Sequence, residues 1–269
     1  MTMPTKTYAI IGGAAGLGGA LARILADGGD AVWLADTPTV AAAAPALANV
    51  AFHPMDLADT PTVAAAAPAL ANVAFHPMDL ADPAAPRALV KTITRRQGRL
   101  DGLVVAASAM GGAPLADWQV DDWDRAAAIN LRLPFLAAQA AEGLLTHSRG
   151  SLILVSSTAT LRGQAQSHAY QATKAGLAGL LRSLAAELGP QGVRVNLVLP
   201  GWVETPQTQA FWRAQPDPNG ARAAIDARIP LRRHGNADEV AAAMAWLLSD
   251  AASYVTGATI PLDGGDTAV

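Results

Sequence analysis

Short apolar runs alternate along most of the chain with longer stretches of helical periodicity. The apolar runs are too short for buried helices and are flanked by turn residues, which is typical of buried strands. Strands that alternate with helices indicate a parallel sheet covered by helices on both faces. The sequence therefore predicts one doubly wound α/β domain over residues 1–269. The predicted strands are 7–11, 31–34, 102–107, 151–155 and 193–199, and the first helix is predicted over 17–26.

A 23-residue segment, 37–59, is repeated without one difference as 60–82. Each copy holds an alanine-rich helix candidate, the strand candidate VAFHPM and an acidic turn. A solenoid needs about three or more repeats, so two copies in an otherwise aperiodic chain indicate a duplication inside one domain. Three arrangements are open: either copy serves while its twin loops out, or the surplus unit adds a parallel strand at the sheet edge through a right-handed crossover. We favour the second copy in the working position, because it joins directly to the helix expected near Pro83.

The charge and composition narrow the class of protein. The chain has 19 Lys and Arg against 22 Asp and Glu, a net charge of −3, so no basic surface for nucleic acid or a membrane is expected. It has no cysteine, which excludes disulfides, thiolate metal sites and cysteine nucleophiles. The amino terminus lacks signal-peptide features, and no charge-free apolar run reaches about 18 residues. We expect a soluble cytoplasmic protein.

A glycine-rich turn, GGAAGLG at 12–18, stands between the first strand and the first helix. Glycines there let the backbone approach a pyrophosphate, which lies at the positive end of the helix, as in Rossmann domains. Asp36 follows Gly18 by eighteen residues and ends the second strand, where a carboxylate accepts hydrogen bonds from a ribose diol and repels a 2′-phosphate. This pattern predicts NAD(H) rather than NADP(H). The alternatives are a plain turn and an Asp36 that only caps the next helix.

A second motif follows the strand at 151–155, which runs into Ser156 and Ser157. Thirteen residues after Ser157, the sequence YQATK places Tyr170 and Lys174 at i and i+4, on one face of a helix. A nearby cation stabilises a phenolate and makes tyrosine usable as an acid or base at neutral pH. A lone pair of this kind is usually a surface tyrosine beside a solvated lysine. The combination with the glycine turn and Asp36 predicts an active site.

These motifs together resemble the short-chain dehydrogenase/reductase family, in its single-domain branch, over nearly the whole chain. The resemblance implies hydride transfer between a nicotinamide cofactor and a carbonyl or alcohol, without a metal, in an enzyme that commonly forms homotetramers. The motifs that carry it are GGAAGLG, WDRAAAINL at 123–131, Ser156-Ser157, YQATK, VRVNLVLPGWVET at 193–205 and YVTGATIPLDGG at 254–265.

The resemblance also implies roles for individual residues. Tyr170 is the general acid/base, Ser157 polarises the substrate oxygen, and Lys174 lowers the tyrosine pKa and holds the nicotinamide ribose. Asn130 orients a water in the proton relay, or else it caps or kinks its helix. The implied cofactor contacts are Gly12, Ala15, Gly16, Leu17, Gly18, Asp36, Asp79 or Asp56 at the adenine, Leu80, Ala107, Tyr170, Lys174, Pro200, Gly201, Val203 and Thr205.

The substrate end is less defined by sequence. The segment Gln207 to Arg228 is expected to form a lid, whose Phe211 and Trp212 are either core or pocket. A separate departure from the family is the sequence VAAS at 105–108, which replaces the asparagine-rich NNAG. Its apolar side chains are expected to lose hydrogen bonds to the central sheet. We expect an apolar, uncharged pocket for a small or medium alcohol or ketone. Its further candidate residues are Ser157, Gln164, His168, Met110 and Trp202.

Three functions fit these observations. The first is an NAD(H)-dependent alcohol dehydrogenase or ketone reductase. The second is a 3-oxoacyl-carrier-protein reductase, which usually prefers NADPH and is therefore disfavoured by Asp36. The third is a cofactor-binding protein without catalysis, in which the duplication has spoiled the alignment of the nicotinamide. A separate alternative is that the doubled segment prevents stable folding of the single chain.

Overall fold

The computed structural model describes residues 5–38, 50–52 and 70–269, and its main element is an eight-stranded sheet in which all paired strands are parallel. The strand order is β10-β7-β6-β5-β1-β2-β4-β3. The strands of this sheet are β1 (Thr7–Ile11), β2 (Ala31–Asp36), β3 (Val50–Phe52), β4 (Leu70–Pro77), β5 (Gly102–Val105), β6 (Ser151–Val155), β7 (Arg194–Pro200) and β10 (Thr259–Leu262); β8 (Val203–Glu204) and β9 (Gly235–Asn236) form a separate pair.

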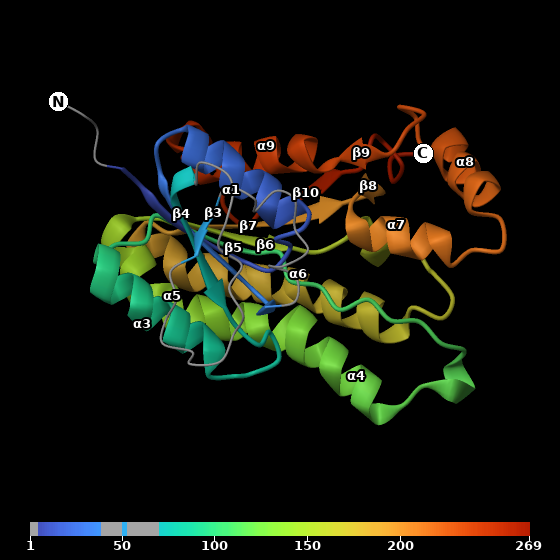
Figure 1. The fold of residues 1–269 in the computed structure, drawn as a ribbon, viewed down its shortest axis with the longest axis horizontal. Coiled ribbons are helices and arrows are strands. Elements are labelled where there is room, and N and C mark those ends of the chain that lie inside the picture. Colours follow the sequence, from blue (N-terminus) through green and yellow to red (C-terminus); the bar gives the residue numbers. More distant parts are fainter. Residues whose placement is uncertain (1–4, 39–49, 53–69) are drawn as a thin grey trace.

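Helices cover both faces of the sheet, with α1 and α9 on one side and α3, α5 and α6 on the other (Figure 1). The main helices are α1 (Leu17–Asp27), α3 (Ala85–Gln97), α4 (Val120–Ala127), α5 (Leu133–Ser148), α6 (His168–Leu188), α7 (Pro206–Arg213), α8 (Pro218–Arg228) and α9 (Ala237–Leu248). The shorter helical turns are η2 (Leu115–Asp117), η3 (Ala128–Arg132), η4 (Thr158–Leu161), η5 (Gly189–Gln191) and η6 (Asp250–Ala252).

Strand β1 shows why the strands of this sheet have continuous apolar sequences. Successive side chains of a strand point to opposite faces of the sheet. Tyr8 and Ile10 pack into the core beneath α1 and α9, whereas Ala9 and Ile11 pack into the core beneath α3, α5 and α6. Both faces are buried, so polar alternation is lost and the strand is almost entirely apolar after Thr7. This confirms the predicted doubly wound α/β class.

The position of β1 also fixes where a ligand binds. β1 lies between β2 and β5, so the chain leaves it first toward one edge of the sheet and later toward the other. This reversal separates the loops at the carboxyl ends of neighbouring strands and opens a crevice. The predicted strands 7–11 and 151–155 have the predicted bounds, while the run 102–107 leaves the sheet at Val105.

The two copies of the repeat supply neighbouring strands. β4 belongs to the second copy and pairs with β2, and β3 belongs to the first copy and pairs with β4 at the sheet edge. Ala51 pairs with Ala74 and Phe52 with Phe75, so equivalent positions of the two copies lie side by side. Of the three arrangements considered, the structure has the additional parallel strand. The alanine-rich stretches of both copies lie outside the described residues.

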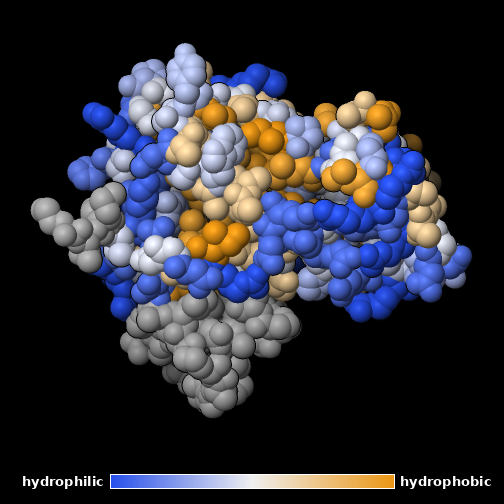
Figure 2. All heavy atoms as spheres, turned by 90° about the horizontal axis from the view of Figure 1, so that it is seen from above, coloured by the Kyte–Doolittle hydropathy of each residue, from blue (hydrophilic) through white to orange (hydrophobic). Residues whose placement is uncertain are grey.

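The surface seen from above gathers its hydrophobic residues toward the centre of that face, bordered by hydrophilic ones (Figure 2). Within the described ranges, no helix combines the length and apolar character needed to cross a bilayer.

Candidate functional site

A cavity of about 960 Å³ opens at the carboxyl edge of the sheet, over the point where the strand order reverses. Its walls come from the glycine turn after β1, the loops after β2, β5 and β6, the face of α6, and the segment from the end of β7 through α8. The predicted lid is thus built of α7 and α8. Segments from all parts of the described chain meet in this one space.

The glycine turn forms one end of the cavity. Gly12 has a φ of +83°, and a Cβ there would lie 2.4 Å from the Cα of Ala107, so only glycine fits between β1 and the loop after β5. Gly16 caps α1 and lines the cavity, and its own Cβ would lie 3.2 Å from Cγ2 of Thr205. The turn therefore presents backbone rather than side chains at the start of a helix. This is the cradle that a dinucleotide pyrophosphate requires.

Asp36 occupies the end of β2 on the same side of the cavity and is only 3% exposed. Its Oδ2 accepts a hydrogen bond from the Ala14 amide at 3.0 Å, and its Oδ1 accepts one from the Thr37 amide at 2.7 Å. Burial raises the pKa of Asp36, and these two bonds oppose that shift. The carboxylate thus ties the glycine turn to β2 and keeps lone pairs free for a ligand. Asp79 lines this end too, whereas Asp56 lies outside the described residues.

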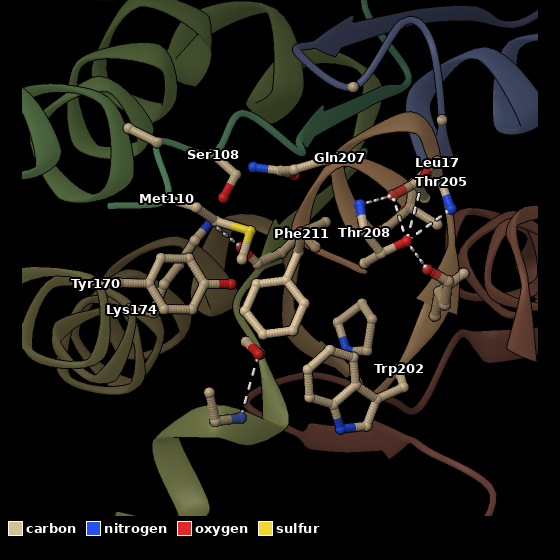
Figure 3. A pocket seen from close by; sticks show the side chains of 18 of the residues that line it. Leu17, Ser108, Met110, Tyr170, Lys174, Trp202, Thr205, Gln207, Thr208 and Phe211 are labelled. Atoms are coloured by element: carbon tan, nitrogen blue, oxygen red, sulfur yellow. Dashed lines mark hydrogen bonds between the residues drawn. The ribbon is translucent and has the colours of Figure 1, made fainter. Parts of the chain in front are cut away.

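Lys174 lies one helical turn after Tyr170, and both side chains project from α6 into the cavity (Figure 3). Lys174 is 2% exposed, and its Nζ donates hydrogen bonds to the carbonyl oxygens of Ala107 at 3.0 Å and Val155 at 2.9 Å. Burial lowers its pKa to about 7. The ammonium therefore joins α6 to the ends of β5 and β6, and at neutral pH it holds its proton only part of the time.

The pKa of Tyr170 corrects one expectation. We expected Lys174 to hold this pKa below its ordinary value, but burial raises it, and the opposing influences come from the Ser157 and Ser108 hydroxyls. The physical reason is that Lys174 is itself buried, has a lowered pKa, and donates to backbone carbonyls. In this structure the phenol keeps its proton at neutral pH, which is the form that donates a proton.

Ser108 is a site residue that sequence reasoning missed. The segment 105–108 was expected to lose polar contacts, yet the Ser108 hydroxyl lies in the cavity and faces the same space as the Tyr170 hydroxyl (Figure 3). The sequence could have identified Ser108 as a site residue, because it is the polar residue of VAAS and follows a buried strand at the carboxyl edge of the sheet. Two serine hydroxyls, from Ser108 and Ser157, therefore act on the tyrosine.

Asn130 is fully buried within η3, a π-helical turn between α4 and α5. Its Oδ1 accepts from the Ala109 amide at 2.8 Å, while its Nδ2 donates to the Ala109 carbonyl at 2.9 Å and to Thr173 Oγ1 at 3.1 Å. Asn130 is not among the residues lining the cavity. These contacts make it a positioning residue for the loop that carries Ser108.

Aromatic side chains from the segment after β7 and from α7 also line the cavity. Trp202 lies 4.8 Å from Trp212 and 5.5 Å from Phe211, measured between ring centroids, and all three line the cavity. Trp212 is also buried, so the lid aromatics serve core and pocket together. His168 does not line the cavity; its ring instead lies 6.0 Å from that of Trp118. His168, a candidate substrate residue from the sequence, is therefore not among the residues that line the cavity.

The prediction of an uncharged pocket is also wrong. Arg162, Arg228 and Asp266 line the cavity, and they come from the end of η4, the end of α8 and the carboxyl-terminal turn. Sequence reasoning missed all three because they are far apart in the chain and belong to no motif. The charge matters in a cavity walled largely by apolar groups, where electrostatic interactions are less screened than in water.

Most candidates from the sequence therefore share the cavity. Gly12, Gly18, Asn130 and His168 lie outside its lining, and the described residues contain no group of three His, Cys, Asp or Glu suited to a metal ion. The candidates that line the cavity are Ala15, Gly16, Leu17, Asp36, Asp79, Leu80, Ala107, Met110, Ser157, Gln164, Tyr170, Lys174, Pro200, Gly201, Trp202, Val203, Thr205, Phe211 and Trp212.

The doubly wound sheet and the site at its switch point define a class of α/β protein that binds a nucleotide or dinucleotide in this crevice. A family model described as enoyl-(acyl carrier protein) reductase matches residues 38–267. The chain belongs to the short-chain dehydrogenase/reductase family.

Three relatives illustrate the range of this family. The 3-oxoacyl-[acyl-carrier-protein] reductase of Thermotoga maritima is 37% identical over 180 residues, 66% of this chain and 71% of that protein. The cis-4-hydroxycyclohexanecarboxylate dehydrogenase of Sinomonas cyclohexanicum is 36% identical over 266 residues, 98% of this chain and 97% of the other. The crystal structure of a levodione reductase has a TM-score of 0.84 and 30% identity, and covers 98% of both chains.

Proposed function

We propose that this protein is an NAD(H)-dependent oxidoreductase that interconverts a secondary alcohol and a ketone. The observation that carries the proposal is one cavity that joins the glycine turn and Asp36 at one end to Ser157, Tyr170 and Lys174 at the other. A nicotinamide cofactor, when bound, supplies the hydride acceptor or donor. The chain supplies the groups that hold the substrate oxygen and move its proton.

Ser157 and Tyr170 are suited to the substrate oxygen because both residues line the cavity and the Tyr170 hydroxyl has the Ser157 and Ser108 hydroxyls as partners. In reduction, the protonated Tyr170 donates its proton to the ketone oxygen while Ser157 donates a hydrogen bond to it. In oxidation, the tyrosine oxygen takes that proton back. Lys174 holds the ends of β5 and β6 around the tyrosine and supplies charge whenever it is protonated.

The preference for NAD(H) rests on Asp36. A carboxylate at the ribose end accepts hydrogen bonds from a diol and repels a 2′-phosphate. The neighbouring lining residues Ala15 and Thr37 carry no positive charge that would compensate. NAD(H) is therefore the favoured cofactor.

A second candidate function is that of a 3-oxoacyl-carrier-protein reductase, favoured by the similarity to the Thermotoga maritima protein. The cyclic substrate in the name of the Sinomonas cyclohexanicum relative favours an alcohol or ketone on a compact hydrocarbon body instead. Turnover with NADH and NADPH, each with an acyl thioester and with a cyclic ketone, separates the two. A catalytically impaired cofactor-binding protein would turn over neither.

A homotetramer is the assembly we propose, supported by apolar residues exposed on the α4 and α5 surface. Phe135 is 45% exposed and Trp123 is 43% exposed. A groove beside them is lined by Leu131, Phe135 and Leu180. Apolar surface of this kind is suited to contact with further copies of the chain.

Tyr170→Phe tests the proposed chemistry. Removing the hydroxyl removes the proton donor, so kcat is expected to fall by about 10²- to 10⁴-fold, while NADH binding stays within about threefold. Steady-state turnover of a ketone panel and NADH fluorescence titration measure the two quantities. Tyr254→Phe is the matched control, because Tyr254 is fully exposed and lies outside the cavity. Undiminished turnover by Tyr170→Phe contradicts the proposal.

A further inference from the structure

We infer that the substrate carries a carboxylate, bound by Arg162 in the cavity that Arg162 shares with Ser157 and Tyr170. The inference rests on the proposed alcohol–ketone chemistry and adds the class of substrate: a hydroxy acid or keto acid with a hydrocarbon body between the two polar groups. Three sets of contacts support it.

The first concerns the placement of Arg162 beside the reacting groups. Arg162 follows Ser157 by five residues and ends the turn η4. Gln171, the residue after Tyr170, donates from Nε2 to the carbonyl oxygens of Ala159 at 2.9 Å and Arg162 at 2.8 Å. The backbone of Arg162 is therefore tied to the same turn of α6 that carries the tyrosine. Arg162 lines the same cavity as Ser157 and Tyr170.

The second concerns the charge balance among the neighbouring side chains. Asp266 is 3% exposed and accepts two hydrogen bonds from Arg228, at 2.8 Å from Nε and 3.0 Å from Nη2. Arg162 Nη2 lies 3.7 Å from Asp266 Oδ1, too far for a hydrogen bond, and donates at 3.4 Å to a main-chain oxygen of Val269, the last residue of the sequence. A guanidinium has five N–H donors, so Arg162 keeps most of its donors free.

The third concerns the remaining charges on the cavity wall. The other lining carboxylates within the described residues are Asp36 and Asp79, both at the adenosine end. Arg125 adds a further positive charge to the lining. Asp266 accepts both of its printed arginine hydrogen bonds from Arg228, so Arg162 keeps donors that an anion in the cavity can use. An anion that binds there gains a charge-assisted hydrogen bond in poorly solvated surroundings.

The rest of the wall defines the body of the substrate. Trp202, which follows β7, and Phe211 and Ile225, which belong to the lid helices α7 and α8, line the cavity, and none of them carries a charge. Apolar side chains there suit a ring or an alkyl chain. The substrate is therefore amphipathic, with its reacting oxygen at Tyr170 and its carboxylate at Arg162.

The alternative role for these arginines is structural, in which they only fix the carboxyl-terminal turn against α8. A matched pair of substrates separates the two roles: 4-oxocyclohexanecarboxylate against its methyl ester, and 4-oxopentanoate against its methyl ester, each with NADH. Wild-type kcat/KM is expected to favour each acid over its ester by about tenfold or more. Rising salt concentration should increase KM for the acids and leave KM for the esters nearly unchanged.

Arg162→Gln is expected to lower kcat/KM for the acids by about 10- to 100-fold and for the esters by less than about threefold. Arg162→Lys restores part of the acid turnover, because it keeps the charge but loses the paired donors. Arg96→Gln is the control, since Arg96 is exposed at the end of α3 and does not line the cavity. Thermal unfolding of each variant reports whether the fold is retained.

Equal wild-type turnover of acid and ester, or an equal loss of both in Arg162→Gln, overturns the inference and leaves the proposed alcohol–ketone chemistry intact. If the variant unfolds, the wild-type acid preference and its salt dependence decide the question. Absence of turnover with every ketone tested, neutral cyclohexanone included, overturns the proposed function and this inference with it.

Discussion

At the scale of single residues, Asp36 combines a structural and a binding role. Its carboxylate holds the glycine turn through the Ala14 amide and also faces the ribose end of the cavity. If a substitution removed both roles, a change in cofactor affinity could come from disorder of the glycine turn or from a changed preference between the two cofactors. The ratio between two cofactors avoids this, since loop disorder affects NADH and NADPH alike.

Asp36→Asn is therefore expected to lower the ratio of kcat/KM for NADH over NADPH by about tenfold or more, because it removes the repulsion of the 2′-phosphate. Asparagine keeps one acceptor oxygen for one of the two amides that bond Asp36 and loses the other acceptor, a loss that affects both cofactors alike. Initial rates with both cofactors measure the ratio. Asp82→Asn is the control, since Asp82 is exposed and outside the cavity lining. An unchanged ratio would show that Asp36 does not select the cofactor.

At the scale of elements, the duplicated segment provides two chemically identical strands with different neighbours. β4 is enclosed between β2 and β3, whereas β3 lies at the edge. Asp79, which follows β4, lines the cavity. Deleting 37–59 or 60–82 yields the same 246-residue sequence, 23 fewer than 269, so deletion cannot tell the copies apart. Point substitutions can.

The repeat supplies its own matched control for this question. Asp79→Ala is expected to weaken NADH binding by about three- to tenfold, because it removes a polar group from the adenosine end, while Asp56→Ala leaves the affinity within about twofold. Fluorescence titration of NADH measures both. The opposite result would place the first copy, rather than the second, beside β2.

At the scale of the whole molecule, burying Lys174 couples the site to stability. Its folded pKa of about 7 lies below the ordinary value of 10.5. Between these values the unfolded chain binds more protons than the folded one, so the free energy of unfolding rises with pH across this window. Below pH 7 the penalty for burying the ammonium is fully present. The site is thus maintained at the expense of stability.

Lys174→Met tests this coupling. The free energy of unfolding of the wild type, minus that of the variant, is expected to rise by up to about 1.4 kcal/mol per pH unit above pH 7. Only the wild type has a buried lysine whose deprotonation removes the cost of burying a charge. Urea unfolding at several pH values between 7 and 9 measures the difference. Lys91→Met, at an exposed position of α3, should give a flat difference. A flat line for Lys174→Met would show that the buried lysine is not titrating as described.

The amino-acid sequence by itself determined the alternation of strands and helices, because period and turn residues act over a few neighbours. It did not predict the last strand, β10, or the short pair β8 and β9. It also placed Asp36, Ser157, Tyr170 and Lys174 at element ends or on one helix face, where local geometry carries them to the same edge of the sheet. Those predictions needed no knowledge of distant contacts.

Tertiary structure alone decided the rest. It set β3 beside β4, placed Ser108 near the tyrosine, and removed Lys174 from water so that the expected pKa relation reversed. It also brought Arg162, Arg228 and Asp266 together from three separate segments. Desolvation and charge pairing depend on contacts between residues that are far apart in the chain, and the local spacing of residues does not predict such contacts.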